Sequence, residues 1–152
     1  MRKQSYYLDT SIFNFLLTAD EDDREITTKA LNEIMKIGAL YISEVVIREI
    51  NAAAEPKRSQ LTDKISFYSP KLLLIDNETQ SLAAKYIAEG VIPEKYADDA
   101  RHIAIATVYG IEVIVSWNFE HIVKLKTRRE VNGINLLSGY REIEICSPEE
   151  VF

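Results

Sequence analysis

Apolar and polar positions alternate along the chain in blocks that predict strands and helices in turn. Continuous apolar runs predict buried strands at residues 5–8, 39–42, 71–75 and 113–116, with a last short strand at 143–145. Amphipathic stretches predict helices at residues 12–17, 25–37, 57–68, 77–89, 98–109 and 122–137, and another that begins near Glu44. Strands separated by helices indicate an α/β fold, in which a mainly parallel sheet of four to five strands is covered on both faces.

Length and composition add bounds to this picture. The chain has 152 residues, of which 47% are hydrophobic, so a single domain over residues 1–152 accounts for it. No apolar run approaches the roughly 20 residues that span a bilayer, and the first residues lack the apolar core of a secretory signal. The single cysteine, Cys146, excludes an intrachain disulfide framework and a cysteine zinc site. We therefore expect a cytoplasmic location without membrane contact.

The candidate chemistry lies where the predicted strands end. Asp9 directly follows the first strand, Asp99 opens the helix before the fourth strand, and Asn118 follows that strand by two residues. Glu49 lies on the helix after the second strand, and its long side chain can reach back toward the same edge. Since parallel strands gather their carboxyl ends at one crevice, these four oxygen-bearing side chains should meet there. Such a set suits Mg²⁺ or Mn²⁺ and predicts a metal-dependent phosphodiester hydrolase.

Two acidic neighbours compete for places in this site. Glu44 lies closer to the strand end than Glu49 does, but it also suits the first turn of a helix, where acids are favoured. Asp98 suits a helix N-cap, whereas Asp99 lies on the apolar side of its helix, where an unpaired carboxylate is costly. We favour Glu49 and Asp99, with Asp98 in a supporting place.

The formal net charge of −6 argues against a broad nucleic-acid-binding surface. A local basic patch would still be enough for phosphate contacts. One basic run follows Asn118 closely, and it consists of Lys124, Lys126, Arg128 and Arg129. We interpret this run as a candidate RNA-binding segment, with a solvated helix face as the alternative.

Four segments taken together resemble the PIN-domain family of ribonucleases. They are YLDTS at 7–11, ISEVVIRE at 42–49, DARHIAIA at 99–106 and VSWNFEH at 115–121. Each motif is short, but their order and spacing match across nearly the whole chain. The resemblance implies a three-layer α/β/α Rossmann-like PIN fold and a Mg²⁺- or Mn²⁺-dependent endoribonuclease.

The resemblance also implies roles and partners. Asp9, Glu49 and Asp99 match the family's acidic triad and would hold the metal, while Asn118 stands where many members carry a fourth acid. Three hydroxyl residues would support these acids, namely Thr10, Ser11 and Ser116. Many small members are VapC-like toxins of toxin–antitoxin pairs, so the implied partners are an RNA substrate, a cognate antitoxin and a second copy of the chain in a homodimer.

One departure from the family pattern keeps an alternative open. Asn118 carries no negative charge, so a second metal should bind more weakly, and a catalytically weak or inactive PIN-like binding module is the rival reading. A phosphatase with an aspartyl nucleophile would want a second Asp where Ser11 stands, and a dinucleotide-binding domain would want a glycine-rich first turn. His102 and His121 are interpreted as packing or surface residues, and Trp117 as a packed aromatic.

Overall fold

The computed structural model describes residues 3–152, in which five parallel strands form one sheet in the order β3-β2-β1-β4-β5. The strands are β1 (Gln4–Leu8), β2 (Gly38–Ser43), β3 (Lys71–Leu73), β4 (Val113–Val115) and β5 (Glu144–Cys146). Each of the four neighbouring pairs is parallel, as the continuous apolar runs predicted. The strand order reverses direction between β1 and β4, and that is where open α/β sheets place their ligand crevice.

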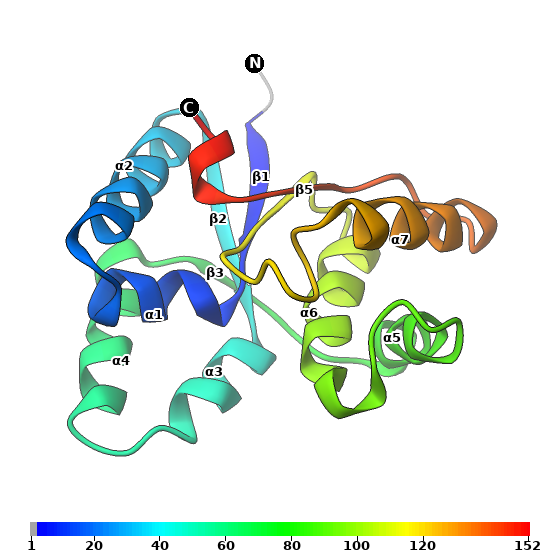
Figure 1. Ribbon diagram of the computed structural model, residues 1–152, viewed down its shortest axis with the longest axis horizontal. Helices are drawn as coiled ribbons and strands as arrows, with labels where there is room; N and C mark the ends of the chain where they lie inside the picture. The colour runs from blue at the N-terminus through cyan, green and yellow to red at the C-terminus, as the bar shows by residue number, and fades with distance from the viewer. Residues whose placement is uncertain (1–2) are drawn as a thin grey trace.

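Helices cover both faces of this sheet. They are α1 (Thr10–Thr18), α2 (Glu21–Ile37), α3 (Glu44–Asn51), α4 (Lys57–Tyr68), α5 (Asn77–Ala88), α6 (Ala97–Val108) and α7 (Leu125–Leu137). Two short 3₁₀ helices lie at Glu94–Tyr96 and Pro148–Glu150. Figure 1 shows α1, α2 and α4 gathered on one side of the strands and α5, α6 and α7 on the other.

Alternation along β1 explains how one sheet serves two apolar cores. Tyr6 and Leu8 pack with residues of α1 to α4, whereas Tyr7 points to the opposite face and packs with α5, α6 and α7. All three side chains are buried. The three-layer arrangement predicted from the strand and helix pattern is therefore confirmed.

Most boundaries differ from the expected ones by a few residues at most. The largest shift is at α2, which begins at Glu21 rather than at residue 25, because the side chain of Asp20 caps it by accepting the backbone N–H of Asp23. Within residues 3–152, none of the helices combines the length and the apolar character needed to cross a membrane.

Candidate active site

The candidate site lies at the carboxyl ends of β1 and β4, where the strand order reverses. Leu8 and Val115 are register partners, so Asp9 and Ser116 leave the sheet side by side. Ser116 donates from its Oγ to Oδ2 of Asp9 at 2.7 Å, and Ser11 donates to Oδ1 at 2.5 Å. The same Ser11 oxygen accepts the backbone N–H of Trp117 at 2.9 Å. Two strands that are more than 100 residues apart in sequence are thus joined through one carboxylate.

Asp9 is a carboxylate with almost no access to solvent, since its exposed fraction is 3%. Burial raises its pKa, and hydrogen bonds from the two serines and the nearby His102 oppose that rise. The negative charge of Asp99 raises the pKa of Asp9 as well. A buried carboxylate next to a second one is an arrangement that a bound cation would stabilise.

Glu49 joins the site from the helix α3. Its Oε1 accepts hydrogen bonds from Thr10 Oγ1 and from His102 Nε2, both at 2.7 Å. Burial raises its pKa, but the hydrogen bonds from His102 and Thr10 outweigh burial and leave it below the ordinary value. Glu44 instead turns to the segment that follows β3, where its Oε2 accepts the backbone N–H of Ile75 at 2.8 Å. Of the two glutamates, the structure brings Glu49 to the crevice.

A chain of buried hydrogen-bonding side chains leads from Glu49 into the protein interior. His102 is 2% exposed, and its Nδ1 lies 2.6 Å from the hydroxyl of Tyr7, which in turn lies 2.7 Å from Ser43 Oγ. An ionised carboxylate only accepts hydrogen bonds, so Nε2 of His102 donates to Glu49. Burial lowers the pKa of His102, but the contact with Glu49 and the charges of Asp9 and Asp99 raise it above the usual value overall.

Asp99 comes from the first turn of α6 and faces the loop after β4. Its Oδ2 lies 3.0 Å from Nδ1 of His121, and the side chain of Asn118 is a further hydrogen-bond partner. Burial raises its pKa, partly offset by Asn118, His102 and His121. The Oδ1 of Asn118 accepts the backbone N–H of His121 at 3.0 Å, so the amide turns its N–H₂ toward Asp99. Asn118 therefore donates to Asp99 with its N–H₂ group, while its Oδ1 accepts from the backbone.

Asp98 is not the N-cap of α6 that its position suggested, because the helix begins at Ala97 and Tyr96 is its N-cap residue. The Oδ1 of Asp98 instead accepts from two arginines, Arg48 Nη2 at 2.5 Å and Arg101 Nη1 at 2.7 Å. Asp98 and Asp99 point to different partners, as neighbouring positions on a helix must.

Two of the four residues in the basic run around α7 have an acidic partner. Lys126 pairs with Glu130 at 2.9 Å, and Arg128 approaches Glu150 of the short helix Pro148–Glu150 at 3.9 Å. Lys124 is the N-cap residue of α7 and Arg129 is exposed on it. Successive residues on a helix project about 100° apart, which separates side chains that are neighbours in sequence.

The donors of the crevice are compatible with a hard divalent cation. Within residues 3–152, no three His, Cys, Asp or Glu side chains gather in a geometry that could hold a metal ion. Mg²⁺, however, is commonly bound through only one or two carboxylates and keeps several of its waters. Asp9 supplies a buried carboxylate and Asp99 a partly buried one, and the charge of Asp99 acts on Asp9. The residues present therefore fit Mg²⁺ or Mn²⁺ through Asp9 and Asp99.

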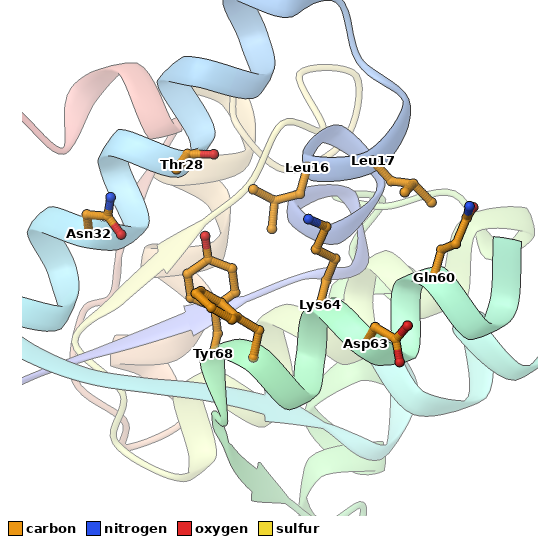
Figure 2. Close-up of a pocket in the computed structure, with 9 residues that line it drawn as sticks. Leu16, Leu17, Thr28, Asn32, Gln60, Asp63, Lys64 and Tyr68 are labelled. Atoms are coloured by element: carbon orange, nitrogen blue, oxygen red, sulfur yellow. The ribbon is translucent and has the colours of Figure 1, made fainter.

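A separate groove of about 620 Å³ lies between α1, α2 and α4, away from these acids. Figure 2 shows the side chains around it, with Thr28 and Asn32 of α2 at the left, Leu16 and Leu17 of α1 at the top, and Lys64 and Tyr68 of α4 below. Its mixed apolar and polar lining contains none of the crevice carboxylates.

The model of the PIN domain matches residues 6–122, which hold the first strand, the three acids and the loop after β4. The chain belongs to the PIN domain family. No curated protein sequence matches it significantly.

Solved structures of similar fold extend the comparison beyond that match. VapBC2 from Rickettsia felis, bound to a DNA fragment from its promoter, superposes with a TM-score of 0.61 at 14% identity. The aligned region covers 95% of this chain and 98% of the VapBC2 chain. VapBC-5 from Mycobacterium tuberculosis gives 0.54 at 19% identity, over 94% and 98% of the two chains. VapC20 from M. tuberculosis, a sarcin–ricin loop cleaving toxin, gives 0.59 at 12% identity, over 91% and 98%. At these identities, the likeness establishes the PIN fold alone.

Both histidines of this PIN domain were missed as partners of the acids. His102 follows Asp99 by three residues on α6, and His121 follows Asn118 by three residues in the next loop. A spacing of three residues on a helix places two side chains on the same side. The position of His102 relative to Asp99 could therefore have predicted that this histidine lies near the acids. Trp117 is packed as expected, with its ring stacked on Phe15 and its Nε1 donating to Thr27 at 2.8 Å.

Proposed function

We propose that this PIN domain is a Mg²⁺- or Mn²⁺-dependent endoribonuclease that acts as the toxin of a toxin–antitoxin pair. The observation that carries the proposal is that Asp99 lies close enough to Asp9 for its charge to act on that carboxylate, with Asp9 buried, Asp99 partly buried and both pKa values raised by burial. The fold it shares with VapC20, a toxin that cleaves the sarcin–ricin loop, supports RNA as the substrate class. The VapBC structures of similar fold support an antitoxin as the partner.

In the proposed reaction, Asp9 and Asp99 hold the cation, which supplies a Lewis acid that eases deprotonation of water and stabilises charge on the phosphate. Ser11 and Ser116 keep Asp9 in its rotamer by bonding both of its oxygens. Glu49 stays ionised because His102 and Thr10 lower its pKa, so it remains an acceptor that can orient the attacking water.

Asn118 has a positioning part in this proposal. Its N–H₂ group donates to Asp99 while its Oδ1 holds the backbone of His121. The amide thus fixes the carboxylate without adding charge, which favours a site built around one principal metal.

The test is cleavage of a structured RNA pool by highly purified protein in Mn²⁺. Asp9→Asn and Asp99→Asn should abolish cleavage while the far-UV CD spectrum stays unchanged, and EDTA should abolish it in the unaltered chain. Asp63→Asn, the same chemical change at an exposed position on α4, should cleave like wild type. Cleavage that persists in Asp9→Asn would show that the activity does not come from this site.

The second candidate is a PIN-like module that binds partners without cleaving RNA. The observation in its favour is Asn118, a neutral side chain that hydrogen-bonds to Asp99 where many members carry a fourth acid. A Mn²⁺ titration separates the two functions, because the nuclease requires Mn²⁺ binding that Asp99→Asn removes. An absence of both binding and cleavage would favour the module.

A further inference from the structure

An acidic chain that cleaves RNA needs positive charge close to its acids. The net charge is −6, and Asp9, Glu49 and Asp99 add three carboxylates at the place where the RNA phosphate must sit. The basic run on α7 does little to offset them, because Lys126 and Arg128 each have a glutamate partner. The source of positive charge should therefore lie elsewhere on the crevice rim.

The group formed by Arg48, Asp98 and Arg101 has an excess of positive charge. Both arginines contact the same oxygen, Oδ1 of Asp98, so two cations share one anion. Between described residues, the other lysine and arginine ion pairs are one to one, at Lys36–Glu33, Arg58–Glu55, Lys126–Glu130 and Arg128–Glu150. The shared oxygen also brings the two guanidinium groups close together.

This arginine pair lies directly beside the candidate site. Arg48 precedes Glu49 on α3, and Asp98 and Arg101 each precede a site residue on α6, namely Asp99 and His102. The two helices contact each other, and Figure 1 shows α3 next to the lower end of α6. Because adjacent helix positions diverge, the arginines line the rim of the crevice while their neighbours point into it.

The arginine side chains are accessible to a ligand. The exposed fraction is 54% for the side chain of Arg48 and 37% for that of Arg101. Each guanidinium carries five N–H donors, and the contact with Asp98 leaves several of them available. Two adjacent guanidinium groups are the arrangement that recognises phosphate oxygens through paired hydrogen bonds.

We propose that Arg48 and Arg101 form a phosphate-binding subsite that holds the RNA backbone next to the bond that is cleaved, with Asp98 keeping the two guanidinium groups together. The subsite rests on the proposed function, since it supplies the substrate contact of the same crevice. Phosphate contacts of this kind position the strand and carry no sequence information.

The proposal predicts that the arginine variants and the aspartate variant change RNA affinity in opposite directions. Arg48→Gln and Arg101→Gln should each weaken RNA binding several-fold and flatten the dependence of log affinity on log salt by about 0.7. Asp98→Asn should strengthen binding, because the amide oxygen can still accept from both guanidinium groups while the negative charge that competes with the phosphate is gone. A purely structural ion cluster would make all three variants behave alike, since each of them weakens the same contacts between α3 and α6.

The experiment is fluorescence anisotropy of the full chain with a fluorescein-labelled single-stranded oligoribonucleotide of mixed sequence, in EDTA at low ionic strength so that no cleavage intervenes. Arg58→Gln is the matched control, because Arg58 on α4 is a similarly exposed arginine that is paired with Glu55. The RNA affinity of this variant should equal that of wild type. Denaturation midpoints of all variants report the structural contribution separately.

Three results would overturn the subsite: no RNA binding by the unaltered chain, unchanged affinity in both arginine variants, or weaker binding in Asp98→Asn. Failure of the subsite and failure of the proposed endoribonuclease give different results. Opposite effects of Arg48→Gln and Asp98→Asn on RNA affinity, without any cleavage in Mn²⁺, would support the subsite and reject the endoribonuclease. Cleavage in Mn²⁺ without these opposite effects would reject the subsite alone.

Discussion

Two buried tyrosines on the same side of the sheet lead to different kinds of hydrogen-bond network. Tyr7 and Tyr86 are both fully buried, and burial raises the pKa of each hydroxyl above its usual value. Tyr86 bonds Asn135 and lies 3.5 Å from Thr107, and Asn135 donates back to Thr107 at 3.2 Å, so this network closes on itself. Tyr7 instead leads through His102 to Glu49, whose side chain is 32% exposed.

The difference shows how a fold separates stability from chemistry. The network of Tyr86 joins α5, α6 and α7 through neutral groups that satisfy one another. Its hydrogen bonds therefore contribute to the free energy of unfolding and do not reach the candidate site. The network of Tyr7 ends on a carboxylate at the crevice, so any change within it reaches the candidate site. Substitutions along the two networks should therefore affect different measurements.

The largest effect is expected in the closed network. Asn135→Ala removes the partner that Tyr86 and Thr107 share, leaves these buried hydroxyls only their long 3.5 Å contact with each other, and creates a cavity, which should cost about 3 kcal/mol of unfolding free energy. Urea denaturation measures this loss. RNA cleavage per folded molecule should stay at the wild-type level.

Asn32→Ala on α2 is the control for that change, because Asn32 is exposed and its loss should alter the unfolding free energy by less than about 0.5 kcal/mol. A loss in Asn135→Ala no larger than that of the control would mean that the closed network is not a stabilising feature.

The next effect is expected where the open network meets Glu49. His102→Ala removes the donor that fixes Glu49, and loss of such an orienting group typically lowers activity by about 10- to 100-fold. The decrease should appear in kcat rather than in KM, because Glu49 is proposed to orient water and not to bind the RNA backbone. Steady-state kinetics on a defined RNA substrate separates the two constants.

His102→Gln is the informative companion. Its amide can still donate to Glu49 and accept from Tyr7, so part of kcat should return. Equal losses in the alanine and glutamine variants, or a change confined to KM, would remove His102 from the positioning of Glu49.

The sequence predicted the strands and the edge at which the acids meet, for a simple physical reason. Buried parallel strands require continuous apolar runs, so the polar residues that end them, such as Asp9, mark the crevice. The helical stripe placed Asp99 on the apolar side of its helix, and in the structure Asp99 contacts His121 whereas Asp98 contacts Arg48 and Arg101. These are properties of local periodicity.

The hydrogen bonds of the site were not predictable in the same way. The network of Tyr7 depends on side chains from β1, the end of β2 and the middle of α6, and nothing in their separate segments signals that they meet. The direction of the Asn118 amide is set by a backbone N–H three residues later. The basic residues of α7 were grouped by sequence distance, which does not predict the partners that Lys126 and Arg128 have in Glu130 and Glu150.

The smallest effect gives the sharpest comparison of the two networks. Tyr7→Phe and Tyr86→Phe each delete one buried hydroxyl from a fully buried ring, so each should cost about 1 to 2 kcal/mol of unfolding free energy. Cleavage should fall only in Tyr7→Phe, since only there does the lost hydroxyl release a histidine that holds Glu49. The fall should be smaller than that of His102→Ala, because the imidazole keeps its direct contact with the carboxylate. A matched loss of stability with cleavage lowered to the same extent in both variants would mean that activity follows general rigidity of the fold. The difference between an open and a closed network would then have no functional meaning.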